Sequence, residues 1–345
     1  MQDVNLLYPH LNTPNSIGII MHQKPDADAM GSSMALCMYL QALGHTVTVI
    51  SPTNWPNYLN WLQYGNKVYD YEANKKSTEE ALNSCAIIFC LDFNHFGRTK
   101  RMADYLASLK CTKVLIDHHQ EPQVEAFTYG ISNTAKSSTC EMVYDFISNA
   151  PTANKLVEAN AITLPIAYCL YSGVMTDTGS FRFGSTTASV HTMVANLLTI
   201  GVVPNTVHEN LFDNFLENRL RFMGHVLTNR MEVYYEYNTV LISIPNKDLV
   251  KYNISTGDTE GLVNLPQSIK GIKMVAIIID RHEEIKLSFR SKGSIDVNTF
   301  ARKYFNGGGH YNASGGSSKK TLQETVKDFV VAMKETKELA NVQMC

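Results

Sequence analysis

The chain has 345 residues, 44% of them hydrophobic, which is enough for two domains that each bury a core. Charged residues make up only 18% and the formal net charge is −2, so the composition excludes a global basic field for holding a long nucleic acid. If the partner is a polyanion, we expect a short one.

Cysteine usage favours a reducing compartment. The seven cysteines are odd in number, form no C-x-x-C pair and mostly lie inside apolar runs such as CAIIFCLDF. The N-terminal segment MQDVNLLYPHLNTPNS has neither a basic region nor an apolar run, and the longest apolar run elsewhere, around 274–279, is too short to span a bilayer. We therefore expect a soluble, cytoplasmic protein with no membrane partner.

The first half of the chain alternates β-rich runs with helical patterns, which is typical of a mostly parallel sheet with crossover helices. The predicted strands are IGII at 17–20, TVTVI at 46–50, AIIFCL at 86–91 and KVLI at 113–116. The first helix is predicted from about 29 to 43 and ends at Gly44. From 137 to about 200 the pattern is largely helical, interrupted by the loop TDTGSFRFGS.

The second half predicts a smaller α/β domain. Strand patterns cover VYYEY, VLISI, KMVAIIID and IKLSFRS, helical patterns cover KDLVKY and VNTFARKYF, and a final amphipathic helix is predicted near 321–339. The pattern of the segment NTVHENLFDNFLENRLRFMGHVL, between the two halves, predicts a helix or a pair of helices. We therefore expect a first domain over 1–189, a helical linker over 190–228 and a second domain over 229–345.

Acidic and histidine side chains gather where the predicted strands end. HQKPDAD follows the first strand, LDFNH includes the end of AIIFCL, and IDHH includes the end of KVLI. In open parallel sheets, ligands bind beyond these carboxyl ends. Asp28 alone is equally well explained as the N-cap of the helix that follows. Several buried carboxylates converging on one pocket, however, imply a cation, because unpaired buried charge is costly.

The mixture of imidazole and carboxylate side chains suits Mn or Mg better than a thiolate-bound zinc. A shared aspartate can hold two such ions about 3.5 to 4 Å apart, an arrangement used for phosphoester cleavage because it activates water and stabilises charge on phosphorus. The pattern therefore predicts a metal-dependent phosphoesterase.

Five motifs together resemble a known family. HQKPDADAMGSS, LDFNHFGRT, IDHH and MTDTGSFRF resemble, in order and context, the four motifs of the DHH phosphoesterase superfamily, and FNGGGHYNASGG resembles the signature of its associated C-terminal domain. The SSTCE segment and the RS-containing strand look most like the branch of bifunctional oligoribonucleases and PAP phosphatases. The resemblance covers nearly the whole chain and implies a mostly parallel-sheet catalytic domain joined by a helical linker to a smaller α/β domain.

The resemblance also implies a role for individual residues. One Mn ion is expected on His22, Asp26 and Asp92, and a second on Asp28, His118 and Asp177 with Asp92 shared; Mg is the alternative metal. His119 is expected to face the scissile phosphate or leaving group, and Asp117 to orient its histidine neighbour. The expected substrate-binding residues are Arg98, Ser137, Ser138, Arg290, Gly307, Gly308, Gly309 and His310.

The glycine triplet has two interpretations. Glycines allow close approach of a ligand, and their exposed N–H groups bind phosphate, but a triplet alone is more often a flexible turn. Arg290 and His310 favour the phosphate site, because arginine pairs with a terminal phosphate in a bidentate manner. Tyr311 departs from the family pattern, in which a smaller residue is expected, and its role in stacking or packing stays open.

The resemblance implies an enzyme that hydrolyses short oligoribonucleotides to mononucleotides and removes the 3′-phosphate of adenosine 3′,5′-bisphosphate (pAp), with the active site in the cleft between domains. The open alternatives are a linear dinucleotide phosphodiesterase and an exopolyphosphatase or pyrophosphatase. A nucleotide sensor without catalysis is the alternative outside enzymes, and it is disfavoured because no expected ligand is missing. Relative rates, preferred length, direction of attack, and the choice between monomer and homodimer stay open.

Overall fold

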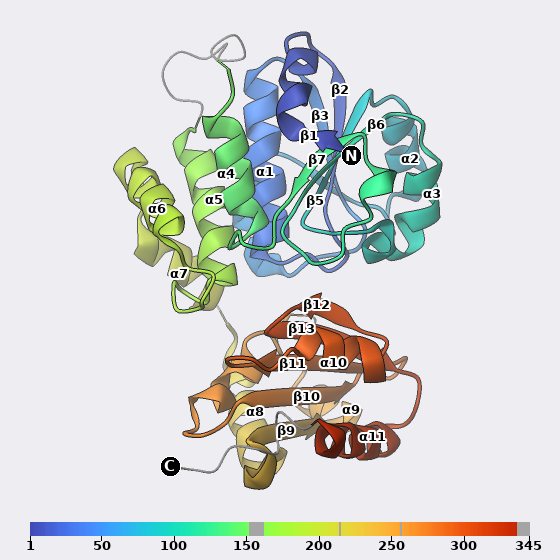
Figure 1. The fold of residues 1–345 in the computed structure, drawn as a ribbon, viewed down its shortest axis with the longest axis vertical. Coiled ribbons are helices and arrows are strands. Elements are labelled where there is room, and N and C mark those ends of the chain that lie inside the picture. The colour runs from blue at the N-terminus through green and yellow to red at the C-terminus, as the bar shows by residue number, and fades with distance from the viewer. Residues whose placement is uncertain (152–161, 214, 256, 337–345) are drawn as a thin grey trace. The chain divides into compact units, whose positions relative to one another are not determined.

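The computed structural model describes residues 1–151, 162–213, 215–255 and 257–336 (Figure 1). The chain divides into two compact units, Met1–Asn214 and Phe215–Cys345. The stretch 190–228, predicted as a linker, contains most of α6 (Ala188–Ile200), then α7 (Pro204–Phe212) and α8 (Glu217–Asn229). Within the described residues, no single helix is long and apolar enough to cross a membrane, and α6 with α7, bent by 104°, meets that length and composition only as a pair.

The first unit is built on a parallel sheet, as the sequence predicted. Its strand order is β1-β7-β6-β5-β2-β3-β4, and every neighbouring pair runs parallel. The strands are β1 (Gln2–Asp3), β2 (Ser16–Ile20), β3 (Thr46–Ser51), β4 (Val68–Asp70), β5 (Ile87–Leu91), β6 (Thr112–Asp117) and β7 (Tyr129–Ser132). The four predicted strands correspond to β2, β3, β5 and β6.

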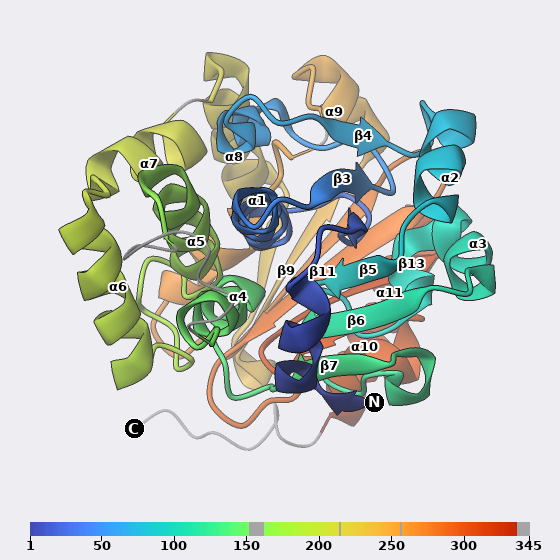
Figure 2. The ribbon, with the colours of Figure 1, turned by 90° about the horizontal axis from the view of Figure 1, so that it is seen from above.

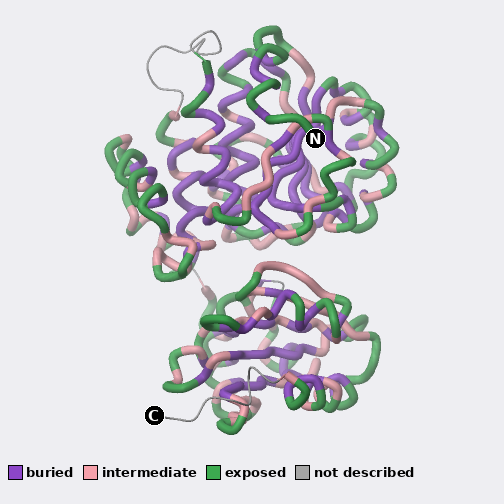
Figure 3. Tube along the Cα trace, viewed as in Figure 1, coloured by how far each residue is buried: buried purple, intermediate pink, exposed green. Residues whose placement is uncertain are grey.

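Helices cover both faces of this sheet (Figures 1 and 2). One face carries α1 (Ala27–Ala42), α4 (Thr139–Ser148) and α5 (Leu164–Asp177), and the other carries α2 (Lys75–Asn83) and α3 (Ala103–Ser108). Ile19 and Phe89 point into the first core, whereas Ile20 and Ile88 point into the second. The central strands are buried on both sides, which explains their continuous apolar sequences (Figure 3).

The second unit is a mixed sheet in the order β12-β13-β11-β10-β9-β8. Only β9 and β10 pair in parallel; the other neighbours are antiparallel. The strands are β8 (Met231–Tyr234), β9 (Thr239–Ile244), β10 (Met274–Asp280), β11 (Ile285–Ser291), β12 (Gly308–His310) and β13 (Ala313–Ser318). One face packs on α10 (Val297–Tyr304) and α11 (Leu322–Glu335), and the other on α8 and α9 (Asn246–Lys251).

The structure adds elements that the sequence did not predict. Strands β1, β4 and β7 have two to four residues, too few for a recognisable alternation. The glycine-rich segment is not only a turn, because it forms the hairpin of β12 and β13. The predicted end of the last helix at 337–339 lies outside the described residues.

Candidate active site

The candidate site lies where the strand order of the first sheet reverses. From β2 the chain continues to β3 and β4 on one side, whereas β5, β6 and β7 lie on the other. The carboxyl ends of two such strands flank the crevice in which open α/β sheets bind ligands. His22 follows β2, Asp92 follows β5 directly, and His118 follows β6. The topology therefore brings together three residues that the sequence selected.

Asp26 begins α1 and also faces His22. Its Oδ1 accepts hydrogen bonds from the backbone N–H groups of Asp28 and Ala29, both at 3.0 Å, so Asp26 is the N-cap. Its Oδ2 lies 3.9 Å from His22 Nε2. The alternative that Asp28 caps this helix is therefore wrong, because Asp28 lies one residue inside the first turn.

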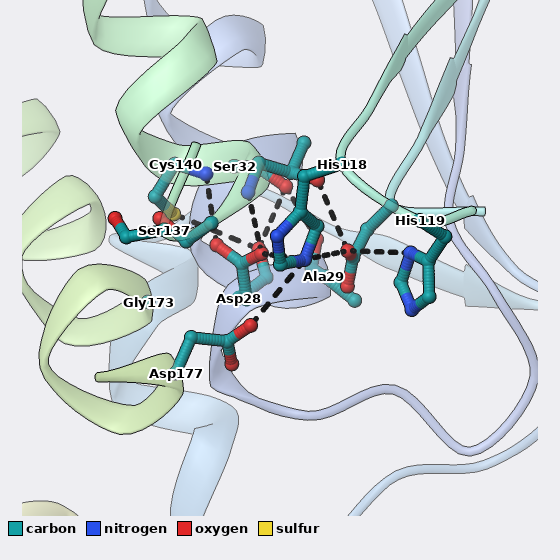
Figure 4. A network of polar contacts seen from close by, with 12 residues as sticks. Asp28, Ala29, Ser32, His118, His119, Ser137, Cys140, Gly173 and Asp177 are labelled. Carbon is teal, nitrogen blue, oxygen red and sulfur yellow. Dashed lines mark hydrogen bonds and ion pairs between the residues drawn. The ribbon is translucent and has the colours of Figure 1, made fainter. Parts of the chain in front are cut away.

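The Asp28 carboxylate is fixed by the start of α4, which is more than a hundred residues away in the sequence. Thr139 N–H donates to Oδ2 at 2.7 Å and Cys140 N–H donates to Oδ1 at 2.8 Å (Figure 4). Both are N–H groups of the first helical turn, where the helix dipole favours negative charge. A Cβ added to Gly173 would lie 2.6 Å from Asp28 Oδ1, so only glycine lets α5 approach this closely.

His118 is surrounded by three carboxylates (Figure 4). Its Nε2 lies 3.4 Å from Asp177 Oδ2, 3.5 Å from Asp92 Oδ1 and 3.8 Å from Asp28 Oδ2. These distances are long for hydrogen bonds. Donors that share one small divalent ion at about 2.1 Å lie roughly 3 to 3.4 Å apart, so this spacing is close to that of a ligand set.

A second group of donors includes the other oxygen of Asp92. His22 Nε2 lies 3.3 Å from Asp92 Oδ2, without the geometry of a hydrogen bond. His22 Nδ1 lies 2.8 Å from the Gln23 carbonyl oxygen, to which it donates when protonated there, and this leaves the Nε2 lone pair facing the carboxylates. Asp92 thus contributes one oxygen to a group with His22 and Asp26 and the other to a group with Asp28 and His118.

Electrostatics shows that these groups hold a surplus of negative charge. Burial and the Asp92 carboxylate raise the pKa of Asp28 to about 8, and burial with the Asp28 charge raises the pKa of Asp177 well above its usual value. Against the effect of burial, Asp92 and Asp177 raise the pKa of His118 to about 10. Protons on Asp28, Asp177 and His118 therefore offset part of this negative charge, and a divalent ion bound there would replace them. The nitrogen and oxygen donors of the groups fit ions such as Mn or Mg.

Asp92 has a strained backbone. Its φ is 64°, in the left-handed region that non-glycine residues rarely adopt, and such a conformation costs on the order of 1 to 3 kcal/mol. It immediately follows β5, and its carboxylate receives a hydrogen bond from Thr139 Oγ1 at 3.0 Å. The strain accompanies the placement of this side chain between the two donor groups.

His119 is oriented by Asp117. Its ring Nδ1 lies 2.7 Å from Asp117 Oδ1, and its backbone N–H donates to Oδ2 at 3.1 Å. The histidine that Asp117 orients is thus His119 and not His118. Burial and the nearby Arg98 charge hold the pKa of His119 well below its usual range. With Nδ1–H donated to Asp117, the neutral ring has Nε2 as its acceptor.

Comparisons with known proteins show to which family the chain belongs. The model of the "DHH family, N-terminal domain" matches residues 16–174, and the model of the "DHHA1 domain" matches residues 237–338. A crystal structure of an exopolyphosphatase-related protein from Bacteroides fragilis is 34% identical, with a TM-score of 0.90 and coverage of 98% of each chain. The chain belongs to the DHH family. The predicted family and two-domain architecture are therefore confirmed.

Curated relatives match most of this chain. A protein of Thermus thermophilus named "Bifunctional oligoribonuclease and PAP phosphatase NrnA" is 28% identical over 304 residues, which cover 88% of this chain and 84% of the relative. A protein of Bacillus subtilis with the same name is 26% identical over 303 residues, which cover 87% of this chain and 88% of the relative. The DHH family assignment and these relatives identify a hydrolytic enzyme of the phosphoesterase class.

In the DHH domain, Ser137 and Ser138 face the interior. The Ser137 N–H and hydroxyl both donate to Glu141 Oε2 at 2.8 Å, and Ser138 Oγ accepts from Glu141 N–H as the N-cap of α4. Both hydroxyls therefore support the start of α4, and the substrate contact predicted for them remains untested. Sequence reasoning missed Thr139, which contacts Asp28 and Asp92 together, although the quoted SSTCE segment contains it.

In the DHHA1 domain, two of the three glycine N–H groups donate hydrogen bonds to other residues of the domain. Gly307 N–H donates to the Ala301 carbonyl, and Gly309 N–H donates to Asn298 Oδ1 at 3.0 Å. These two groups are therefore not the exposed donors that the sequence predicted. Gly309 has a φ of +147°, and a Cβ there would lie 2.7 Å from the Ala313 carbonyl oxygen. Close pairing of β12 with β13 explains the need for glycine.

Arg290 and His310 lie on the same sheet as these glycines. Arg290 is half-buried on β11 and pairs in register with Ala313 on β13, which also pairs with His310 on β12. Both residues thus occupy one row across three strands. Their predicted contact with substrate phosphate is compatible with this row and is not tested by it.

Proposed function

We propose that this DHH enzyme hydrolyses short oligoribonucleotides to mononucleotides and removes the 3′-phosphate of pAp, with two divalent ions, preferably Mn. The observation that carries the proposal is Asp92, whose two oxygens belong to two separate histidine and carboxylate groups. The printed names of the T. thermophilus and B. subtilis relatives support the two substrates. The low net charge and the free cysteines support a short substrate and a reducing cytoplasm.

The donor groups define where the ions would bind. His22, Asp26 and Asp92 would hold one ion, and Asp92 with Asp28, His118 and Asp177 the other. Bound there, two divalent ions supply Lewis acidity and activate water for in-line attack on phosphorus.

Other side chains act directly on the substrate. His119, oriented by Asp117, offers Nε2 to a proton of the attacking or leaving group. Arg98, whose charge already influences His119, balances the charge that develops on the phosphoryl oxygens. In the DHHA1 domain, Arg290 and His310 bind a terminal phosphate at the far end of the substrate, which retains the substrate while the bond is cleaved.

A second candidate substrate is polyphosphate. The B. fragilis relative, 34% identical over nearly the whole chain, is named as exopolyphosphatase-related. Inorganic polyphosphate presents the same scissile group as an oligonucleotide but has no nucleoside. The two candidates therefore differ in what the DHHA1 domain must recognise.

A product time course tests the proposal. Labelled RNAs of about two to twenty nucleotides, a range that includes the usual footprints of single-strand-binding domains, are incubated with Mn beside pAp, polyphosphate and pyrophosphate. We expect mononucleotides from the shortest RNAs and AMP from pAp, with no activity in excess chelator. Asp92→Asn keeps a residue that tolerates the left-handed backbone and removes the shared charge, so it serves as the inactive control. Release of phosphate from polyphosphate alone would contradict the proposal.

A further inference from the structure

One face of the DHHA1 sheet changes from apolar to polar at β11. On β9 and β10 this face carries residues such as Val275, Ile277 and Ile279, which are buried in a core with α8 and α9. These three residues pair in register with Arg290, Ser288 and Lys286 of β11, respectively. Since residues directly opposite in a ladder point to the same face, the apolar surface gives way to a polar strip at β11.

The polar strip follows β11 in a strict alternation. Lys286, Ser288 and Arg290 are half-buried, whereas Leu287 and Phe289 between them point into the opposite core. The neighbouring β13 contributes only small residues to the strip, at positions 313, 315 and 317. Strands β11, β12 and β13 contain no acidic residue. The side chains of the strip itself are therefore neutral or cationic, as the binding of a polyanion requires.

The surface beside the strip allows an extended ligand to lie close to the strand. A Cβ added to Gly315, which pairs with Ser288, would meet only the Leu287 carbonyl oxygen, at 3.4 Å. Because Gly315 has no side chain, the surface beside Ser288 lies closer to the sheet than the surface formed by the longer side chains of Lys286 and Arg290. A narrow, extended chain such as a sugar-phosphate backbone fits this surface better than a bulky, compact ligand does.

The spacing of the strip matches the repeat of a nucleic acid strand. Alternate residues of a β-strand lie about 6.8 Å apart. In a protein backbone, three bonds separate neighbouring Cα atoms, which lie about 3.8 Å apart. In a nucleic acid, six bonds separate consecutive phosphorus atoms. Twice as many bonds span at most about twice that distance, about 7.6 Å. In polyphosphate only two bonds separate phosphorus atoms, so its repeat is shorter than about 3.8 Å. The strand period therefore fits oligonucleotides and not polyphosphate.

We propose that Arg290, Ser288 and Lys286 form a phosphate ladder that binds consecutive phosphates of a short RNA. The inference rests on the proposed function and deepens it, because it sets how many nucleotides the enzyme recognises. Arg290, which the family resemblance assigns to a phosphate, takes the first phosphate of the series, Ser288 the following one and Lys286 the third. A 5′-phosphorylated tetranucleotide cleaved at its 3′-terminal linkage has three phosphates on one side of the scissile one and occupies all three positions, whereas pAp and a 5′-phosphorylated dinucleotide have one such phosphate and occupy only Arg290.

The test compares Lys286→Ala with the wild type on pAp and on 5′-phosphorylated RNAs of increasing length. We expect unchanged kinetics on pAp and the dinucleotide, and a roughly tenfold higher KM on the tetranucleotide, as for the loss of one charge-assisted contact. The salt dependence of kcat/KM on the tetranucleotide decreases by about 0.7 in log–log slope, the value for one phosphate of a single strand. Lys286→Arg keeps the charge and restores the KM.

Lys334→Ala is the matched control, because Lys334 is an exposed lysine near the end of α11, which packs on the opposite face of the same sheet. An effect of Lys286→Ala that equals the control at every length, or that is the same for pAp and the tetranucleotide, overturns the ladder. If the wild type hydrolyses none of the RNAs, the proposed function fails instead. The two failures are therefore distinguishable.

Discussion

Removal of the Thr139 hydroxyl tests how the protein holds its metal-binding carboxylates. Thr139 is fully buried, and its Oγ1 donates to Asp92 Oδ1 at 3.0 Å while its N–H donates to Asp28. Thr139→Val keeps the branched shape and the N–H but leaves Asp92 without this donor. A hydrogen bond to a charged acceptor contributes about 1.5 to 3 kcal/mol, so we expect Mn affinity to fall by about one to two orders of magnitude. Substitutions of residues that orient metal ligands have effects of similar size.

Calorimetric titration of the metal-free protein with Mn measures this change without relying on turnover. Thr139→Ser is the matched variant, since it restores the hydroxyl and loses only a methyl group. Urea unfolding of both variants in the metal-free state checks that the fold is retained. If Thr139→Val bound Mn as tightly as the wild type, or if Thr139→Ser bound it as weakly as Thr139→Val, the orienting role of this hydroxyl would be refuted.

Three further outcomes are expected. Arg290→Ala should lower kcat/KM for oligonucleotides by about ten- to a hundredfold and affect bis-p-nitrophenyl phosphate much less; equal losses on both would assign Arg290 to the chemical step or the fold. Turnover should fall steeply for RNAs beyond about five nucleotides with a shallow salt dependence, and a slope for six or more phosphates would contradict this. Despite burial, Arg230 and His225 hold the pKa of Asp248 below its usual value, so its stabilisation is present above about pH 4 and lost as pH falls through the folded-state pKa. Asp248→Asn should therefore lower the unfolding free energy by about 2 kcal/mol at neutral pH and less in acid, whereas a pH-independent loss in urea unfolding would exclude this explanation.

The sequence predicted the elements whose pattern is local. Strands β2, β5 and β6 are continuous apolar runs rich in β-branched residues, and such runs identify buried parallel strands without tertiary information. The short β4 and β7 carry polar residues and form only because neighbouring strands offer a partner, so no local pattern marks them.

The site was predictable as a list of residues and not as an arrangement. The motifs selected Asp28 and Asp92, but the bonds from Thr139 to both join segments that are 111 and 47 residues apart in the sequence. The close approach of α5 at Gly173 and the left-handed backbone of Asp92 likewise depend on packing that the sequence does not display. The family resemblance supplied the ligand set; the structure supplied what orients it.

Anomalous diffraction from crystals of the protein loaded with Mn tests the central claim most directly. We predict two peaks per chain at the manganese edge, one beside His22 and one beside His118, with Asp92 contacting both. A single peak, or peaks away from these three residues, would contradict a two-metal site.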